Sequence, residues 1–150
     1  MSTAADYIKQ AEDWAKNERP KKAIEAYEQA IAYLVKQPTT SQTQLQMATC
    51  FQELGHLWRL LGNNKHTGSN YKKSLDLYVA AHRDAPHEDT ATATFLIGSF
   101  LSQIWKVVPA IDYLKKAHAM MATLHGADHT YTTGIAAHLE QAIKKQSEFK

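Results

Sequence analysis

An internal repeat constrains this chain more than any other feature of its sequence. Three pairs of large residues are each separated by 13 positions, and the pairs recur every 43 or 44 residues. The pairs are Trp14 and Tyr27, Trp58 and Tyr71, and Leu101 and Leu114. A small residue, Ala11, Gly55 or Gly98, stands three positions before each pair. Because a small residue lets a second helix approach while a large one fills the space beside it, we predict three similar helix hairpins.

The rest of the chain also has a helical pattern. Apolar residues recur at three- and four-residue spacing, and alternating runs of β-branched residues are nearly absent. We expect seven helices, over residues 3–17, 20–36, 40–61, 66–84, 88–104, 108–124 and 129–147. Pro20 and Pro109 mark helix starts, while Gly62 and Gly126 permit the backbone that ends a helix. The short links between helices predict antiparallel neighbours.

One segment carries a family signature. Phe51-x2-Leu54-Gly55-x2-Trp58 resembles the first helix of a tetratricopeptide repeat. The period exceeds the usual figure of roughly 34 residues. Together with the turn at 124–129, this long period resembles the extended repeats of kinesin light chains. In that resemblance Asp128 caps the last helix or braces the turn before it.

The resemblance implies a fold and a domain layout. We expect an all-α, right-handed superhelix of antiparallel helix hairpins in one domain, residues 1–150. Its repeats cover about 3–36, 40–84 and 88–124, and a capping helix covers about 129–147. A cap is needed because each hairpin covers its apolar face only by stacking on the next. The polar end at Lys144 and Lys145 suits this role.

Composition narrows the function classes. The chain has 17 basic and 15 acidic residues, too even a balance for nonspecific nucleic-acid binding. No apolar stretch approaches the ~20 residues of a membrane span, and the start lacks the order of a secretory signal. Cys50 is the only cysteine, so an internal disulfide is impossible and a reducing compartment is expected. We predict a cytoplasmic protein in which Cys50 is a packed thiol.

The sequence shows no catalytic or cofactor-binding motif. Its eight histidines form no His-Glu-x-x-His arrangement, and phosphate loops and nucleophile elbows are absent. We therefore predict no metal, no cofactor and no enzymatic activity. His82, His87, His125 and His129 are expected to form hydrogen bonds at helix ends. Trp105 stands in a turn that usually takes a small residue, and is either a contact residue or packed flat on its hairpin.

The resemblance also implies a binding groove lined by the first helices of the repeats. The residues expected to face it are Ile8, Glu12, Gln52, His56, Arg59, Phe95, Ser99, Ser102, His138 and Lys145. An exposed aromatic side chain makes Phe95 the best anchor candidate. The basic edge at Arg59 and Lys145 suggests a partner with an acidic segment.

Two functions fit these features of the sequence. The first is a protein–protein interaction module, an adaptor or scaffold that holds a peptide or helix of a partner in the groove. The alternative is a structural subunit or self-assembling protein that uses the convex face or the last helix. The sequence does not determine the oligomeric state.

Overall fold

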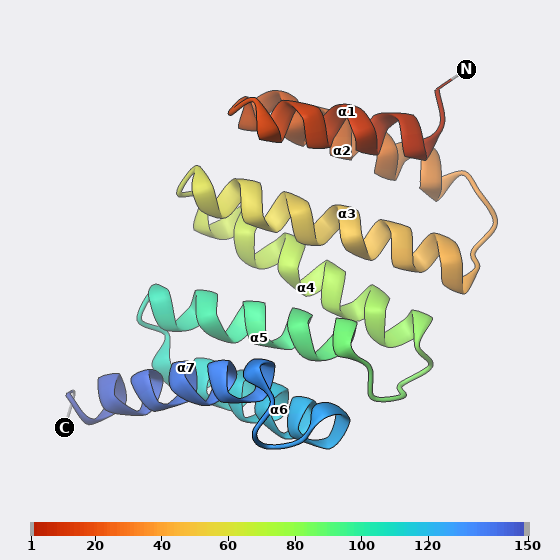
Figure 1. The fold of residues 1–150 in the computed structure, drawn as a ribbon. Helices are drawn as coiled ribbons and strands as arrows, with labels where there is room; N and C mark the ends of the chain where they lie inside the picture. Colours follow the sequence, from red (N-terminus) through yellow and green to blue (C-terminus); the bar gives the residue numbers. More distant parts are fainter. Residues whose placement is uncertain (1, 149–150) are drawn as a thin grey trace. The chain divides into compact units, whose positions relative to one another are not determined.

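The computed structural model describes residues 2–148, which contain seven α-helices and no strand. The helices are α1 (Ala4–Lys16), α2 (Pro20–Val35), α3 (Ser41–Leu60), α4 (Asn64–Ala81), α5 (Glu88–Gln103), α6 (Val107–His125) and α7 (Thr130–Ser147). The predicted all-α class and helix order are confirmed. Figure 1 shows α1 with α2, α3 with α4, and α5 with α6 as antiparallel hairpins.

The helix ends agree with the prediction to within three residues, and α4 differs most. It begins early because the Asn63 side chain accepts a hydrogen bond from the His66 N–H at 3.0 Å. It ends early because Arg83 and Asp84 have positive φ angles of 53° and 63°. Side-chain capping and left-handed residues thus set limits that apolar spacing does not show.

The chain gathers into two compact units. The first runs up to Asp84 and contains α1 to α4, and the second runs from Ala85 and contains α5 to α7. Each unit has its own buried apolar clusters. Within these residues no helix is both long and apolar enough to cross a membrane.

The three hairpin turns share one backbone geometry. Their central residues, Glu18, Gly62 and Trp105, have φ angles of 60°, 77° and 63°. The residue after each donates its N–H to the carbonyl five residues earlier, at 2.8 to 3.0 Å. This is the Schellman arrangement, in which a left-handed residue satisfies the last carbonyls of a helix. Trp105 therefore holds a conformation that favours glycine, as the comparison with Gly62 indicates.

The predicted contact between small and large residues is present in both units. A Cβ atom on Gly55 would overlap the Tyr71 ring, and one on Gly98 would lie 2.8 Å from Leu114 Cγ. Tyr71 and Leu114 are themselves buried. In the first hairpin Ala11 is fully buried, as its small size requires. The repeat register read from the sequence is thus the register of the packing.

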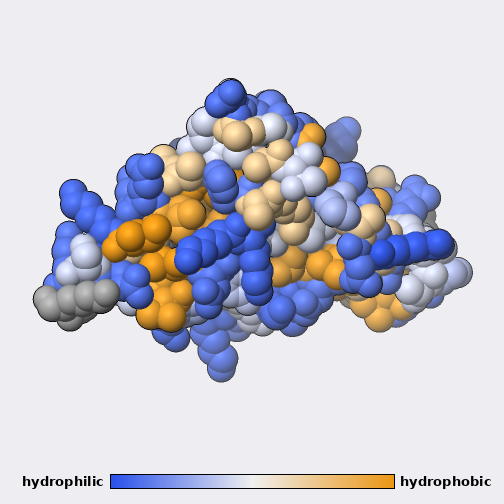
Figure 2. Space-filling view, turned by 90° about the horizontal axis from the view of Figure 1, so that it is seen from below, coloured by the Kyte–Doolittle hydropathy of each residue, from blue (hydrophilic) through white to orange (hydrophobic). Residues whose placement is uncertain are grey.

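The last helix, α7, does not carry the repeat's residue types at the positions that would contact a further helix. The positions equivalent to Phe51, Leu54, Gly55 and Trp58 are Ala137, Glu140, Gln141 and Lys144, all exposed. These side chains can stay in water, so α7 suits the expected role of a cap. Figure 2 shows the face that α6 and α7 form, with apolar surface interrupted by hydrophilic side chains.

Of the two roles expected for Asp128, capping the last helix is not the one seen in the structure. His129, not Asp128, is the N-cap residue, and its Nδ1 accepts the N–H of Tyr131 at 3.1 Å. The imidazole takes the place of the expected carboxylate because it lies directly before the first helical residue.

Replacing Gly55 with leucine tests the packing register. The new side chain would collide with Tyr71, and we expect the free energy of unfolding to fall by about 1–3 kcal/mol. Gly134 is the control, since nothing lies within 4 Å of a Cβ built there. Gly134→Ala should raise stability by roughly 0.5–1 kcal/mol, because glycine disfavours a helix interior. Urea unfolding followed by circular dichroism measures both, and equal midpoints for Gly55→Leu and the parent would reject the register.

Candidate functional site

A pocket of about 450 Å³ opens in the second unit between α5 and α7, with α6 contributing to its wall. The lining residues are Glu88, Thr92 and Phe95 from α5, Met121 from α6, and Thr130, Tyr131, Gly134, Ile135 and His138 from α7. The volume lies within the range of ~300–1,000 Å³ typical of ligand sites. The pocket lies on the side of α5 and α7 that carries Phe95 and His138.

Helical spacing explains which side chains meet in this pocket. Glu88, Thr92 and Phe95 are separated by four and three residues, so they share one face of α5. Met121 and Ile135 are almost fully buried and form apolar wall, whereas Phe95 remains partly accessible. The rings of Phe95 and His138 meet edge to face, with centroids 4.9 Å apart. Two of the residues expected to face a groove thus lie against each other in this pocket.

Gly134 keeps the pocket open. It lines the pocket in the middle of α7, and a Cβ built on it would meet no atom within 4 Å. Glycine inside a helix costs about 1 kcal/mol relative to alanine. No neighbour requires the missing side chain, in contrast to Gly55. The sequence offered no sign of this role, because the repeat pattern has no position for an open space.

Two histidines, His125 and His129, lie beside the pocket residue Glu88. His125 Nε2 lies 3.2 Å from Glu88 Oε2, and the His125 ring stacks on His129 with centroids 4.6 Å apart. An ionised carboxylate only accepts hydrogen bonds, so Nε2 of His125 carries the proton in this contact. His129 is fixed in turn by the bond from the Tyr131 N–H.

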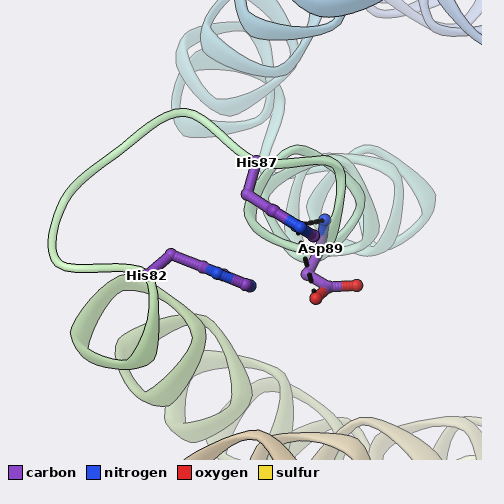
Figure 3. Close-up of side chains that lie close together, drawn as sticks. All are labelled: His82, His87 and Asp89. Atoms are coloured by element: carbon purple, nitrogen blue, oxygen red, sulfur yellow. Dashed lines mark hydrogen bonds and ion pairs between the residues drawn. The ribbon is translucent and has the colours of Figure 1, made fainter. Parts of the chain in front are cut away.

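The start of α5 is held in the same way. His87 is its N-cap residue, and its Nδ1 accepts the Asp89 N–H at 3.0 Å. Figure 3 shows the two side chains together, with His87 Nδ1 3.3 Å from an Asp89 carboxylate oxygen. The predicted use of His87 and His129 at helix ends is confirmed.

The far end of α7 is occupied by a lysine contact within the unit. Lys145 Nζ donates to the Ser102 carbonyl at 2.8 Å and lies 4.7 Å from the centre of the Trp105 ring. Trp105 is 52 % exposed. Ser99 and Ser102 are buried, so these two predicted groove residues present little surface to a partner. Lys145 is partly buried by its own unit rather than extended into solvent.

The first unit holds the other predicted residues on α1 and α3. Ile8 packs against the buried cluster, Glu12 is exposed, and Gln52 is half-buried. His56 Nδ1 lies 2.7 Å from the Tyr71 hydroxyl, and burial together with the Arg59 charge lowers the pKa of His56. His56 is therefore part of the packing around Tyr71 as well as a surface residue.

Two further titratable side chains of α3 lie close to α1 and α2. Burial, with a contribution from Glu53, raises the pKa of the Cys50 thiol to about 12. The thiol stays protonated at neutral pH, as expected for a packed cysteine. Burial and the nearby Glu12 raise the pKa of Glu53 above its ordinary value. Sequence reasoning did not single out Glu53, since the helical spacing alone does not show its burial.

The raised pKa of Glu53 predicts a pH-dependent stability. The native state disfavours the ionised carboxylate, so Glu53 costs stability at pH 7 and this cost disappears on protonation. Glu53→Gln should raise the melting temperature at pH 7, and the gain should vanish below the ordinary pKa of 4.5. Thermal melts of parent and variant at both pH values measure this. An equal difference at the two pH values would show that ionisation is not the cause.

The fold and its repeated contacts define the class of the protein as a tetratricopeptide-like helical repeat. The family model described as "Uncharacterized protein conserved in bacteria (DUF2225)" matches residues 2–146. The chain therefore belongs to the DUF2225 family. No curated protein matches it.

Several solved structures have a similar fold. BtubC (BKLC) from P. vanneervenii matches 97 % of this chain with a TM-score of 0.84 and 17 % sequence identity. A putative kinesin light chain from Podosopora anserina with nearly identical TPR-like repeats matches 98 % at a TM-score of 0.79 and 15 % identity. The chain spans 57 % of the first protein and 70 % of the second. At these identities the likeness concerns the fold.

Proposed function

We propose that this chain is a non-enzymatic protein-interaction module, a cytoplasmic adaptor or scaffold. It holds a segment of another protein in the pocket between α5 and α7. The observation that carries this proposal is an open, largely apolar pocket in which a helix glycine leaves space unfilled. Burying a large apolar side chain is worth about 1.5–3 kcal/mol, so such a pocket favours an apolar anchor.

The polar groups around the pocket support a protein ligand. Thr92, Thr130 and His138 place hydroxyl and imidazole groups beside the apolar wall. A peptide brings both an apolar side chain and backbone N–H and C=O groups, which need hydrogen-bond partners when they leave water. The pocket therefore offers what an anchored peptide requires, whereas it contains no cysteine and only one carboxylate.

The long repeat supports a relationship in fold to kinesin light chains. The 43- and 44-residue intervals and the likeness to a putative kinesin light chain agree on this point. We infer that the three hairpins are extended repeats of that type. The pocket then lies between the first helix of the third repeat, α5, and the capping helix, α7. Repeat proteins commonly bind their partners on extended surfaces of this kind.

A substitution at Gly134 tests the proposed site without removing any side chain. A random-peptide phage library is selected on the parent protein, and the enriched peptides are labelled and titrated by fluorescence anisotropy. Gly134→Met should weaken their binding about tenfold or more, because the methionine side chain occupies the space of the anchor.

The matched control is Ala137→Met on the same helix. Ala137 is exposed and lies outside the pocket lining, so its replacement should leave the affinity unchanged. Circular dichroism and thermal melts check that both variants fold. Equal affinities of the two variants, or a selection that enriches no peptide, would contradict the proposal.

A further inference from the structure

The charges of the second unit are unevenly distributed around the pocket. The pocket is formed by the start of α5, the end of α6 and the start of α7. No lysine or arginine occurs in α5, in α6 after Lys116, or in α7 before Lys144. The same segments and the link 126–129 contain Glu88, Asp89, Asp128 and Glu140, and the first three of these lie at the pocket end. This end of the unit is therefore acidic, while its lysines lie farther along the helices.

Glu88 is the charged side chain that reaches the pocket. The lining residues include no other aspartate or glutamate and no lysine or arginine, and the Glu88 side chain is 45 % exposed. Its contact in the structure is with His125, at 3.2 Å. Exposed ion pairs of this kind contribute only about 0–1 kcal/mol. A stronger cation can therefore replace His125 beside Glu88 at little cost.

The Glu88 carboxylate and the apolar wall at Phe95 lie at different heights along α5. Glu88 and Phe95 are seven residues apart on one face of the helix, which corresponds to about two turns. Two turns span roughly 10 Å, the reach of a few residues of an extended peptide or two turns of a bound helix. One short segment can thus bring an apolar and a cationic side chain to both places.

We infer that the partner segment carries a lysine or arginine that pairs with Glu88, close in sequence to the large apolar side chain that fills the space over Gly134. This inference rests on the proposed function, since it specifies the ligand of the same pocket. It differs from the sequence-based expectation of an acidic partner. That expectation depended on the basic edge, where Lys145 instead donates to Ser102 within the unit.

The test removes each charge of the proposed pair in turn, one in the peptide and one in the protein. Peptides enriched on the parent protein should contain a lysine or arginine near a large apolar residue. Each peptide is prepared in two forms, as selected and with its basic residue replaced by glutamine. Both forms are titrated against the parent protein and against Glu88→Gln, which gives four affinities. We expect either change alone to weaken binding about five- to tenfold, and the second change to add little once the first is made.

Asp128→Asn is the control for the general charge of this end. Asp128 is acidic and exposed but lies outside the pocket lining, so its removal should affect binding little. A loss as large as that of Glu88→Gln would mean a diffuse charge effect and would overturn the pairing.

The remaining outcomes separate this inference from the proposed function. If the selected peptides lack basic residues, or if Glu88→Gln binds them as the parent does, the inferred pairing of a basic residue with Glu88 is wrong. Should Gly134→Met still abolish binding in that case, the pocket itself stands. If Gly134→Met and Ala137→Met bind alike, the pocket is not the site and both proposals fail together.

Discussion

The structure depends on the close contact between the first and second helix of each hairpin. Gly55 lies against Tyr71 and Gly98 against Leu114, so tightly that neither glycine has room for a Cβ atom. Close-packed interiors tolerate changes of even one methyl group poorly, so each contact fixes how its two helices cross. Three turns of one geometry bring the paired helices into this position. The repeat is therefore a repeated packing contact as well as a repeated sequence.

The candidate site arises where this repetition ends. In α7 the positions of the hairpin contact carry Glu140, Gln141 and Lys144, which stay exposed, while Thr132, Ile135 and Ala142 are buried. The helix thus packs on one side and leaves Gly134 and His138 toward the pocket. An apolar wall, a histidine rim and one carboxylate then lie within a single unit. This combination suits an anchored peptide with a basic residue better than a small reactive substrate.

Much of the fold could be predicted from the sequence because its signals are local. Apolar spacing and the glycine positions indicated seven helices, and the repeat predicted that Gly55 and Gly98 allow a close approach of the second helix. The site was less predictable. Phe95 and His138 were both expected to face a groove from their places in the repeat. The burial of Ser99 and Ser102 and the contacts of Lys145 depend on side-chain packing. Gly134 and Glu88 were missed because open space and the exposure of one carboxylate leave no pattern in a single sequence.

A double-mutant cycle at Gly98 and Leu114 tests the central contact most directly, in the unit that holds the pocket. Gly98→Ala should destabilise the parent, and it should cost less in a Leu114→Ala background, where the Cγ and Cδ atoms that the added methyl group would meet are gone. Urea unfolding of the four proteins should give a coupling energy of about 0.5–3 kcal/mol. Strictly additive effects would mean that the two residues do not pack as described, and the repeat register built on this contact would be wrong.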